Sequence, residues 1–83
     1  MIKTRARILL VDDHELFREG VSNVINNQPD MEVVGQADDG LEALTLAHEL
    51  HPDLILMDIN MPLSNGLEAT ELIHASVPEC III

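Results

Sequence analysis

Two apolar runs of this 83-residue chain each end in carboxylates. Residues 9–11 (Leu-Leu-Val) are followed by Asp12 and Asp13, and residues 54–57 (Leu-Ile-Leu-Met) are followed by Asp58. A short uncharged aliphatic run is typical of a strand buried on both faces of a parallel sheet. An acid directly after such a strand lies at the carboxyl edge of the sheet, where open α/β folds bind their ligands. Carboxylate oxygens are the ligands that Mg²⁺ prefers, so this pattern predicts a magnesium site.

The acids at this site are expected to differ in role. We expect Asp13 and Asp58 to coordinate the metal directly and Asp12 to act through water. The backbone carbonyl of Asn60 would add a further ligand. Carboxylates this close repel one another, so a bound cation would keep them all ionised. A carboxylate at a metal site can also attack phosphorus, which makes Asp58 a candidate acceptor of a phosphoryl group.

The segments that must position these acids alternate between two patterns. Short runs rich in Ile, Val and Leu predict strands at residues 8–11, 32–37, 54–57 and 80–83. Three stretches with helical spacing lie between them. The first has a single apolar stripe, formed by Leu16, Phe17, Gly20, Val21, Val24 and Ile25.

The second and third helices have recognisable starts. Asp39 stands three residues before Glu42, which is the spacing of a capping box. Asn65 stands three residues before Glu68 in the same way. The residues expected to face inward are Leu41, Leu44, Ala47 and Leu50 in the second helix, and Leu67, Thr70, Leu72 and Ile73 in the third.

Strands that alternate with helices imply a parallel sheet with right-handed crossovers. If the first crossover steps to one side and the second returns past the first strand, the strand order is 2-1-3-4. The first and third strands are then neighbours, and their ends bring Asp12, Asp13 and Asp58 together. The last predicted strand ends at the last residue, so we interpret the chain as cut short. Its bare apolar edge would pair or exchange strands between copies, giving a homodimer or a strand-exchanged oligomer.

The charge of the chain limits the kinds of partner that it can bind. Lys and Arg total 4 against 15 Asp and Glu, and every base except Arg18 lies in the first seven residues. This distribution argues against nucleic-acid contact by this segment, which would need a basic face. It favours a cation or a protein with a basic patch. No run is long enough to span a membrane or to form a signal peptide, so we expect a cytoplasmic protein.

The acidic motifs together match a known family. Residues 11–14 (Val-Asp-Asp-His) and 56–62 (Leu-Met-Asp-Ile-Asn-Met-Pro), with Gly66 four positions on, closely resemble the receiver domain of two-component response regulators. Residues 11–20 resemble the nitrate-response-type subfamily, whose members usually continue into a helix-turn-helix DNA-binding domain. The resemblance covers essentially the whole chain and makes residues 1–83 the N-terminal portion of a receiver domain.

The resemblance also implies a fold, a reaction and its residues. The fold is a flavodoxin-like α/β sheet, and the function is to accept phosphoryl from a histidine kinase and so control transcription in the complete protein. Asp58 is the phosphoacceptor by this resemblance, Asp12 and Asp13 hold Mg²⁺, and Asn60 contributes its carbonyl. A receiver of this kind is not an enzyme.

The chain departs from the family pattern in three places. The family fold has five strands, whereas this chain supplies four and lacks the last two helices. The hydroxyl residue after the fourth strand is absent, as is the Lys after the fifth, and Lys3 lies before the first strand. We therefore expect Mg²⁺ binding to survive better than phosphorylation, and signal output to be missing from this segment.

Two other functions stay open. One is a non-switching module that pairs with an intact regulator and blocks it, which the missing Lys and hydroxyl favour if the chain is natural. The other is a Mg²⁺-dependent phosphohydrolase with an Asp nucleophile. Those enzymes place a second acid two positions after the nucleophile, whereas here Asp12 and Asp13 are adjacent and His14 follows. His14 either influences the site or starts the first helix, and the partner of Arg18 is left open between Glu15, Glu19 and another protein.

Overall fold

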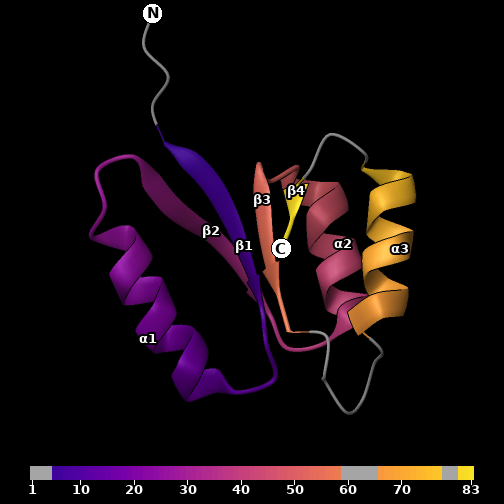
Figure 1. Cartoon of the computed structure of the whole chain (residues 1–83), viewed down its shortest axis with the longest axis horizontal. Helices are drawn as coiled ribbons and strands as arrows, with labels where there is room; N and C mark the ends of the chain where they lie inside the picture. The colour runs from indigo at the N-terminus through magenta and orange to yellow at the C-terminus, as the bar shows by residue number, and fades with distance from the viewer. Residues whose placement is uncertain (1–4, 59–65, 78–80) are drawn as a thin grey trace, which may run out of the picture.

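Strands and helices alternate along the chain as the sequence predicts (Figure 1). The computed structural model describes residues 5–58, 66–77 and 81–83. In chain order the elements are β1 (Ala6–Val11), α1 (Glu15–Asn26), β2 (Met31–Ala37), α2 (Gly40–Leu50), β3 (Leu54–Met57), α3 (Gly66–Ser76) and β4 (Ile81–Ile82). The start of the fourth predicted strand, at Cys80, lies outside the described residues.

The sheet has the predicted strand order. Its four strands run β2-β1-β3-β4, and every neighbouring pair is parallel. At the carboxyl edge, Val11 of β1 is in register with Ala37 of β2 on one side and with Met57 of β3 on the other. The residues that directly follow β1 and β3 are therefore neighbours in space, which confirms the adjacency on which the predicted acid site depends.

The alternation of side chains along β1 divides the core into two layers. Leu9 and Val11 lie with Ile55 and the buried residues of α2 and α3, whereas Ile8 and Leu10 lie with Ile25 of α1. Helix α1 accordingly lies on one side of the sheet, and α2 and α3 lie side by side on the other (Figure 1). The layer under α2 and α3 is the larger core.

Helix α1 buries much less of its apolar stripe than the sequence predicts. Ile25 is buried and Val21 packs partly against the same cluster, but Leu16 is 82% exposed, and Phe17 and Val24 are also mostly exposed. The reason is the position of α1, which packs on β1 and β2. Within the described residues, no helix covers this face of the sheet beside α1.

The residues predicted to face inward in α2 and α3 are also wrong in part. Ala47 faces inward as predicted, but Leu41 is exposed and its place is taken by Ala43, one helical turn before Ala47. In α3, Ile73 is fully buried whereas Leu72 is 50% exposed. Consecutive residues on a helix point in directions about 100° apart, so both could not face one core. The side chain of Leu67 lies outside the described residues.

The start of α2 confirms the capping prediction. The side chain of Asp39 accepts a hydrogen bond of 2.8 Å from the backbone amide of Glu42. The carboxylate of Glu42 turns back and accepts 3.1 Å from the amide of Asp38, one residue earlier than in the usual capping box. This start fixes the loop that joins β2 to α2.

Candidate metal centre

The structure brings together the three predicted acids. Asp12, Asp13 and Asp58 offer carboxylate oxygens that lie within 4.8 Å of one another and of the imidazole of His14. Asp12 and Asp13 come from the loop after β1, and Asp58 follows β3. Asn60, the fourth predicted ligand, lies outside the described residues, as do Met61 and Pro62.

Backbone hydrogen bonds fix this convergence. The amide of Asp58 donates to the carbonyl of Val11 at 3.0 Å, and the amide of Asp12 donates to the carbonyl of Ala37 at 3.0 Å. Each bond extends the strand pairing by one residue beyond the ladder. The backbones of Asp12 and Asp58 are therefore fixed by the sheet, whereas Asp13 follows in the loop before α1.

His14 takes both of the roles that the sequence left open. It is the N-cap residue of α1, with an extended backbone at φ −103° and ψ 100°. Its backbone amide donates to Oδ1 of Asp12 at 2.8 Å, and its ring Nδ1 lies 3.0 Å from the same oxygen. The hydrogen bond to Asp12 raises the pKa of His14 above its ordinary value, and the negative charges of Asp13 and Asp12 raise it further.

Asp13 is the acid with unused ligand capacity. Its Oδ1 lies 3.0 Å from Nδ1 of His14, but that nitrogen carries at most one proton and already lies 3.0 Å from Asp12. Within the described residues, Oδ1 of Asp13 is buried and has no hydrogen-bond partner, although the side chain as a whole remains 25% exposed. An unpartnered oxygen among three carboxylates is what a divalent cation with oxygen ligands would satisfy.

The chemistry of the donors therefore fits Mg²⁺. Asp12, Asp13 and Asp58 could hold the ion, and all three offer hard oxygen atoms. His14 offers a nitrogen, which suits transition metals better than Mg²⁺. The imidazole is better described as a neighbour that partly neutralises Asp12 when it is protonated.

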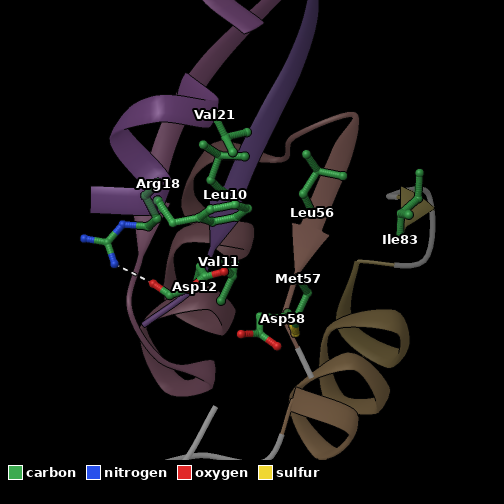
Figure 2. Close-up of a pocket in the computed structure, with 10 residues that line it drawn as sticks. Leu10, Val11, Asp12, Arg18, Val21, Leu56, Met57, Asp58 and Ile83 are labelled. Carbon is green, nitrogen blue, oxygen red and sulfur yellow. Dashed lines mark hydrogen bonds between the residues drawn. The ribbon is translucent and has the colours of Figure 1, made fainter. Parts of the chain in front are cut away.

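Arg18 has a partner that the sequence did not indicate. Its Nη1 donates to the backbone carbonyl of Asp12 (Figure 2). Its Nε donates to the side-chain oxygen of Gln36 at 3.2 Å. From the sequence, Glu15 and Glu19 were possible partners because they lie near Arg18 in the helix. The only available signal was that Arg18 is the single base between residue 8 and the end of the chain.

A pocket of about 230 Å³ opens beside the acids. Asp12, Asp58 and Arg18 line its polar end, and most of its remaining wall is apolar, from α1 and from Leu10 and Leu56 of the sheet (Figure 2). The pocket lies on the α1 face of the sheet, next to the part of that face that α1 does not cover. Asp12 and Asp58 are thus open to the surface on this side.

No helix in the described ranges 5–58 and 66–77 is long and apolar enough to cross a membrane. This finding agrees with the sequence, in which no apolar run reaches that length.

Comparison with known proteins identifies the arrangement. The model of the response regulator receiver domain matches residues 8–83. The chain is 48% identical over 68 residues to the transcriptional regulatory protein DegU of Brevibacillus brevis, covering 82% of this chain and 29% of that protein. It is 49% identical over 73 residues to the response regulator protein VraR of Staphylococcus epidermidis, covering 88% and 35%.

A solved structure of a response regulator has the same fold as this chain. The two-component response regulator of the LuxR family from Aurantimonas superposes with a TM-score of 0.88 at 41% identity, covering 94% of this chain and 56% of that one. The chain therefore spans about a third of the length of these two relatives and a little over half of this solved chain.

Proposed function

This chain belongs to the response regulator receiver family, close to the regulators of the NarL and LuxR type, and on that premise we propose that Asp58 accepts a phosphoryl group from a histidine kinase. Membership makes it a signalling module and not an enzyme, which removes the phosphohydrolase alternative. The proposal is supported most directly by one observation. Three carboxylates at the ends of two neighbouring strands converge within 4.8 Å, and among the described residues a buried oxygen of Asp13 has no hydrogen-bond partner.

In this proposal the carboxylates have different roles. Asp12, Asp13 and Asp58 would hold Mg²⁺, and the carbonyl of Asn60 would add a further ligand. When bound, Mg²⁺ would neutralise the negative charge on the phosphoryl oxygens. A carboxylate oxygen of Asp58 attacks phosphorus, the new P–O bond forms as the P–N bond to the kinase histidine breaks, and the bonding electrons leave with the imidazole.

The residues present favour metal binding over a stable phosphorylated state. The only lysine in the sequence is Lys3, before β1, so this segment offers no lysine ammonium after the fourth strand to contact the phosphoryl oxygens. We propose that the segment binds Mg²⁺ well and is phosphorylated weakly. The alternative of a non-switching module would share the metal site and lack the phosphorylation, so the same experiment separates the two.

The complete protein would be a cytoplasmic transcription regulator. The role in transcription is supported by one similar protein, which is named the transcriptional regulatory protein DegU, and a second is named a two-component response regulator of the LuxR family. With a net charge of −11, this segment has no basic face for DNA, so a further domain would make that contact. The phosphorylated receiver would act on it by altering dimerisation.

The edge of the sheet at β4 supports a contact between copies. β4 is the last strand in the order, and the side chains of Ile81 and Ile83 are exposed, Ile83 to 69%. We propose that two copies pair or exchange strands there, because apolar edge strands readily pair. Light scattering should show a mass that grows with concentration, and Ile81→Lys should reduce this growth. A wild-type monomer from micromolar to millimolar concentration would contradict the contact.

Intact mass after incubation with acetyl phosphate and Mg²⁺ tests the function. The wild type should gain one phosphoryl group on a fraction of molecules, and Asp58→Ala should gain none. Asp30→Asn is a matched control, since it also removes a carboxylate but lies in the turn before β2, at the opposite edge of the sheet. An adduct that persists in Asp58→Ala would show that another residue is the acceptor.

A further inference from the structure

Arg18 connects three elements around the acid cluster. It belongs to α1, its Nη1 donates to the carbonyl oxygen of Asp12 after β1, and its Nε donates to Gln36 of β2. A guanidinium group is planar, and its donors diverge in fixed directions, so two acceptors at once restrict it strongly. Arg18 is partly buried, and Figure 2 shows its guanidinium on the side of Asp12 away from Asp58.

The carbonyl that accepts from Arg18 belongs to the first residue after β1. The carbonyl of Val11 accepts from Asp58, and the amide of Asp12 donates to Ala37, which completes the pairing of β1. The next carbonyl, that of Asp12, accepts from Arg18. The direction of the chain from Asp12 into Asp13 and His14 therefore depends on this contact.

We propose that Arg18 is a positioning residue, which orients the loop of Asp12 and Asp13 so that their carboxylates converge on the Mg²⁺ site. This inference rests on the proposed function, because it assigns a residue to the same metal site. Arg18 acts through the backbone of Asp12 and does not touch the reacting atoms. Partners one step removed from a metal commonly change its affinity by one to two orders of magnitude when they are lost.

The direction in which the Mg²⁺ affinity changes when Arg18 is replaced distinguishes a positioning role from a purely electrostatic effect. Arg18 carries a positive charge near a site for a cation, so removing it only as a charge would tighten Mg²⁺ binding. A positioning role predicts weaker Mg²⁺ binding when Arg18 is replaced. Calorimetric titration of the chain with Mg²⁺ should show about tenfold weaker binding in Arg18→Gln. Arg18→Lys keeps the charge but lacks the fork, so it should restore part of the loss.

Two further variants complete the test. Gln36→Ala removes the second anchor of the guanidinium without changing any charge, and it should weaken Mg²⁺ binding in the same direction by a smaller factor. Gln36 is exposed, so this variant is expected to fold even if Arg18→Gln does not. Arg5→Gln removes the same charge just before the start of β1, at the far end from the acids, and should leave the affinity unchanged or slightly increased.

The outcomes are distinct. The positioning role is supported if Mg²⁺ binds more weakly to Arg18→Gln and to Gln36→Ala. Arg18→Lys should then recover part of the affinity, and Arg5→Gln should lose none. Equal or tighter binding in Arg18→Gln overturns it while the metal site stands. If Arg18→Gln does not fold, an unchanged affinity in Gln36→Ala overturns it. A wild-type chain that takes up no Mg²⁺ overturns the proposed function, and the inference falls with it.

Discussion

The backbone amide of Asp58 donates a hydrogen bond of 3.0 Å to the carbonyl oxygen of Val11. This single bond joins the ends of β1 and β3, whose next residues carry the acids. Because a strand pairing fixes both backbones, the separation of the Asp12 and Asp58 backbones is a property of the sheet. The three carboxylates therefore lie together without a bound metal, and their mutual repulsion costs free energy.

Replacing Asp13 by Asn should stabilise the metal-free protein and weaken its metal binding. The substitution removes one charge from the cluster, which should raise the free energy of unfolding without Mg²⁺ by about 1 kcal/mol or less, given the partial exposure of Asp13. Added Mg²⁺ should stabilise the wild type and have much less effect on the variant. Thermal melts with and without Mg²⁺ check both parts. A variant that is stabilised by Mg²⁺ as much as the wild type would contradict the role of Asp13.

The imidazole of His14 should titrate above the ordinary value of about 6.5 in the metal-free protein. The pKa is raised because the protonated ring is favoured first by its hydrogen bond to Asp12 and then by the charge of Asp13. The resulting stability is present below the unfolded pKa and is lost as pH rises through the higher folded pKa. Proton NMR titration of His14 with chelator present measures the shift.

The control for this titration is Asp12→Asn. It removes the negative charge of Asp12 and leaves only a neutral acceptor for the hydrogen bond, while the charge of Asp13 remains, so the pKa of His14 should fall in the variant. An unchanged pKa would mean that the ring does not contact Asp12 in solution.

The inward face of α3 can be tested with two neighbouring residues. Ile73→Ala should lower the free energy of unfolding by about 2–4 kcal/mol, because Ile73 is fully buried in the larger core. Leu72→Ala should cost about 0.5 kcal/mol or less, because half of Leu72 is exposed. Urea unfolding followed by circular dichroism gives both values. Similar costs for the two variants would contradict the helix orientation.

The helix start at Asp39 provides an independent check on local structure. Asp39→Ala removes the acceptor of the Glu42 amide and should cost about 1 kcal/mol. Asp39→Ser should restore most of this loss, since a hydroxyl oxygen can accept the same bond. Urea unfolding of the three proteins measures the difference, and an unaffected Asp39→Ala would show that the cap contributes nothing.

Most of the fold and of the acid site could be predicted because they depend on strong local patterns. The strands at 8–11 and 54–57 have aliphatic runs that end in Asp, and the strand order follows from chain alternation and crossover handedness. The start of α2 at Asp39 was predicted from three-residue spacing, and the structure confirms it.

What could not be predicted depends on tertiary packing. Hydrophobicity does not distinguish Leu72 from Ile73, and only the angle at which α3 meets the sheet buries one of them. The exposure of Phe17 follows from where α1 sits on β1 and β2, which no residue of α1 encodes alone. The contact of Arg18 with the carbonyl of Asp12 joins a side chain to a backbone atom, and backbone acceptors leave no signature in the sequence.

The most direct test of the account is to locate the metal by NMR. Substoichiometric Mn²⁺, which can replace Mg²⁺ at oxygen sites and broadens nearby signals, should broaden the amides of Asp12, Asp13 and Asp58 together, and excess Mg²⁺ should restore them. Broadening confined to one of the two strand ends, or centred on other acids such as Asp38 and Asp39, would contradict a shared metal site at the ends of β1 and β3.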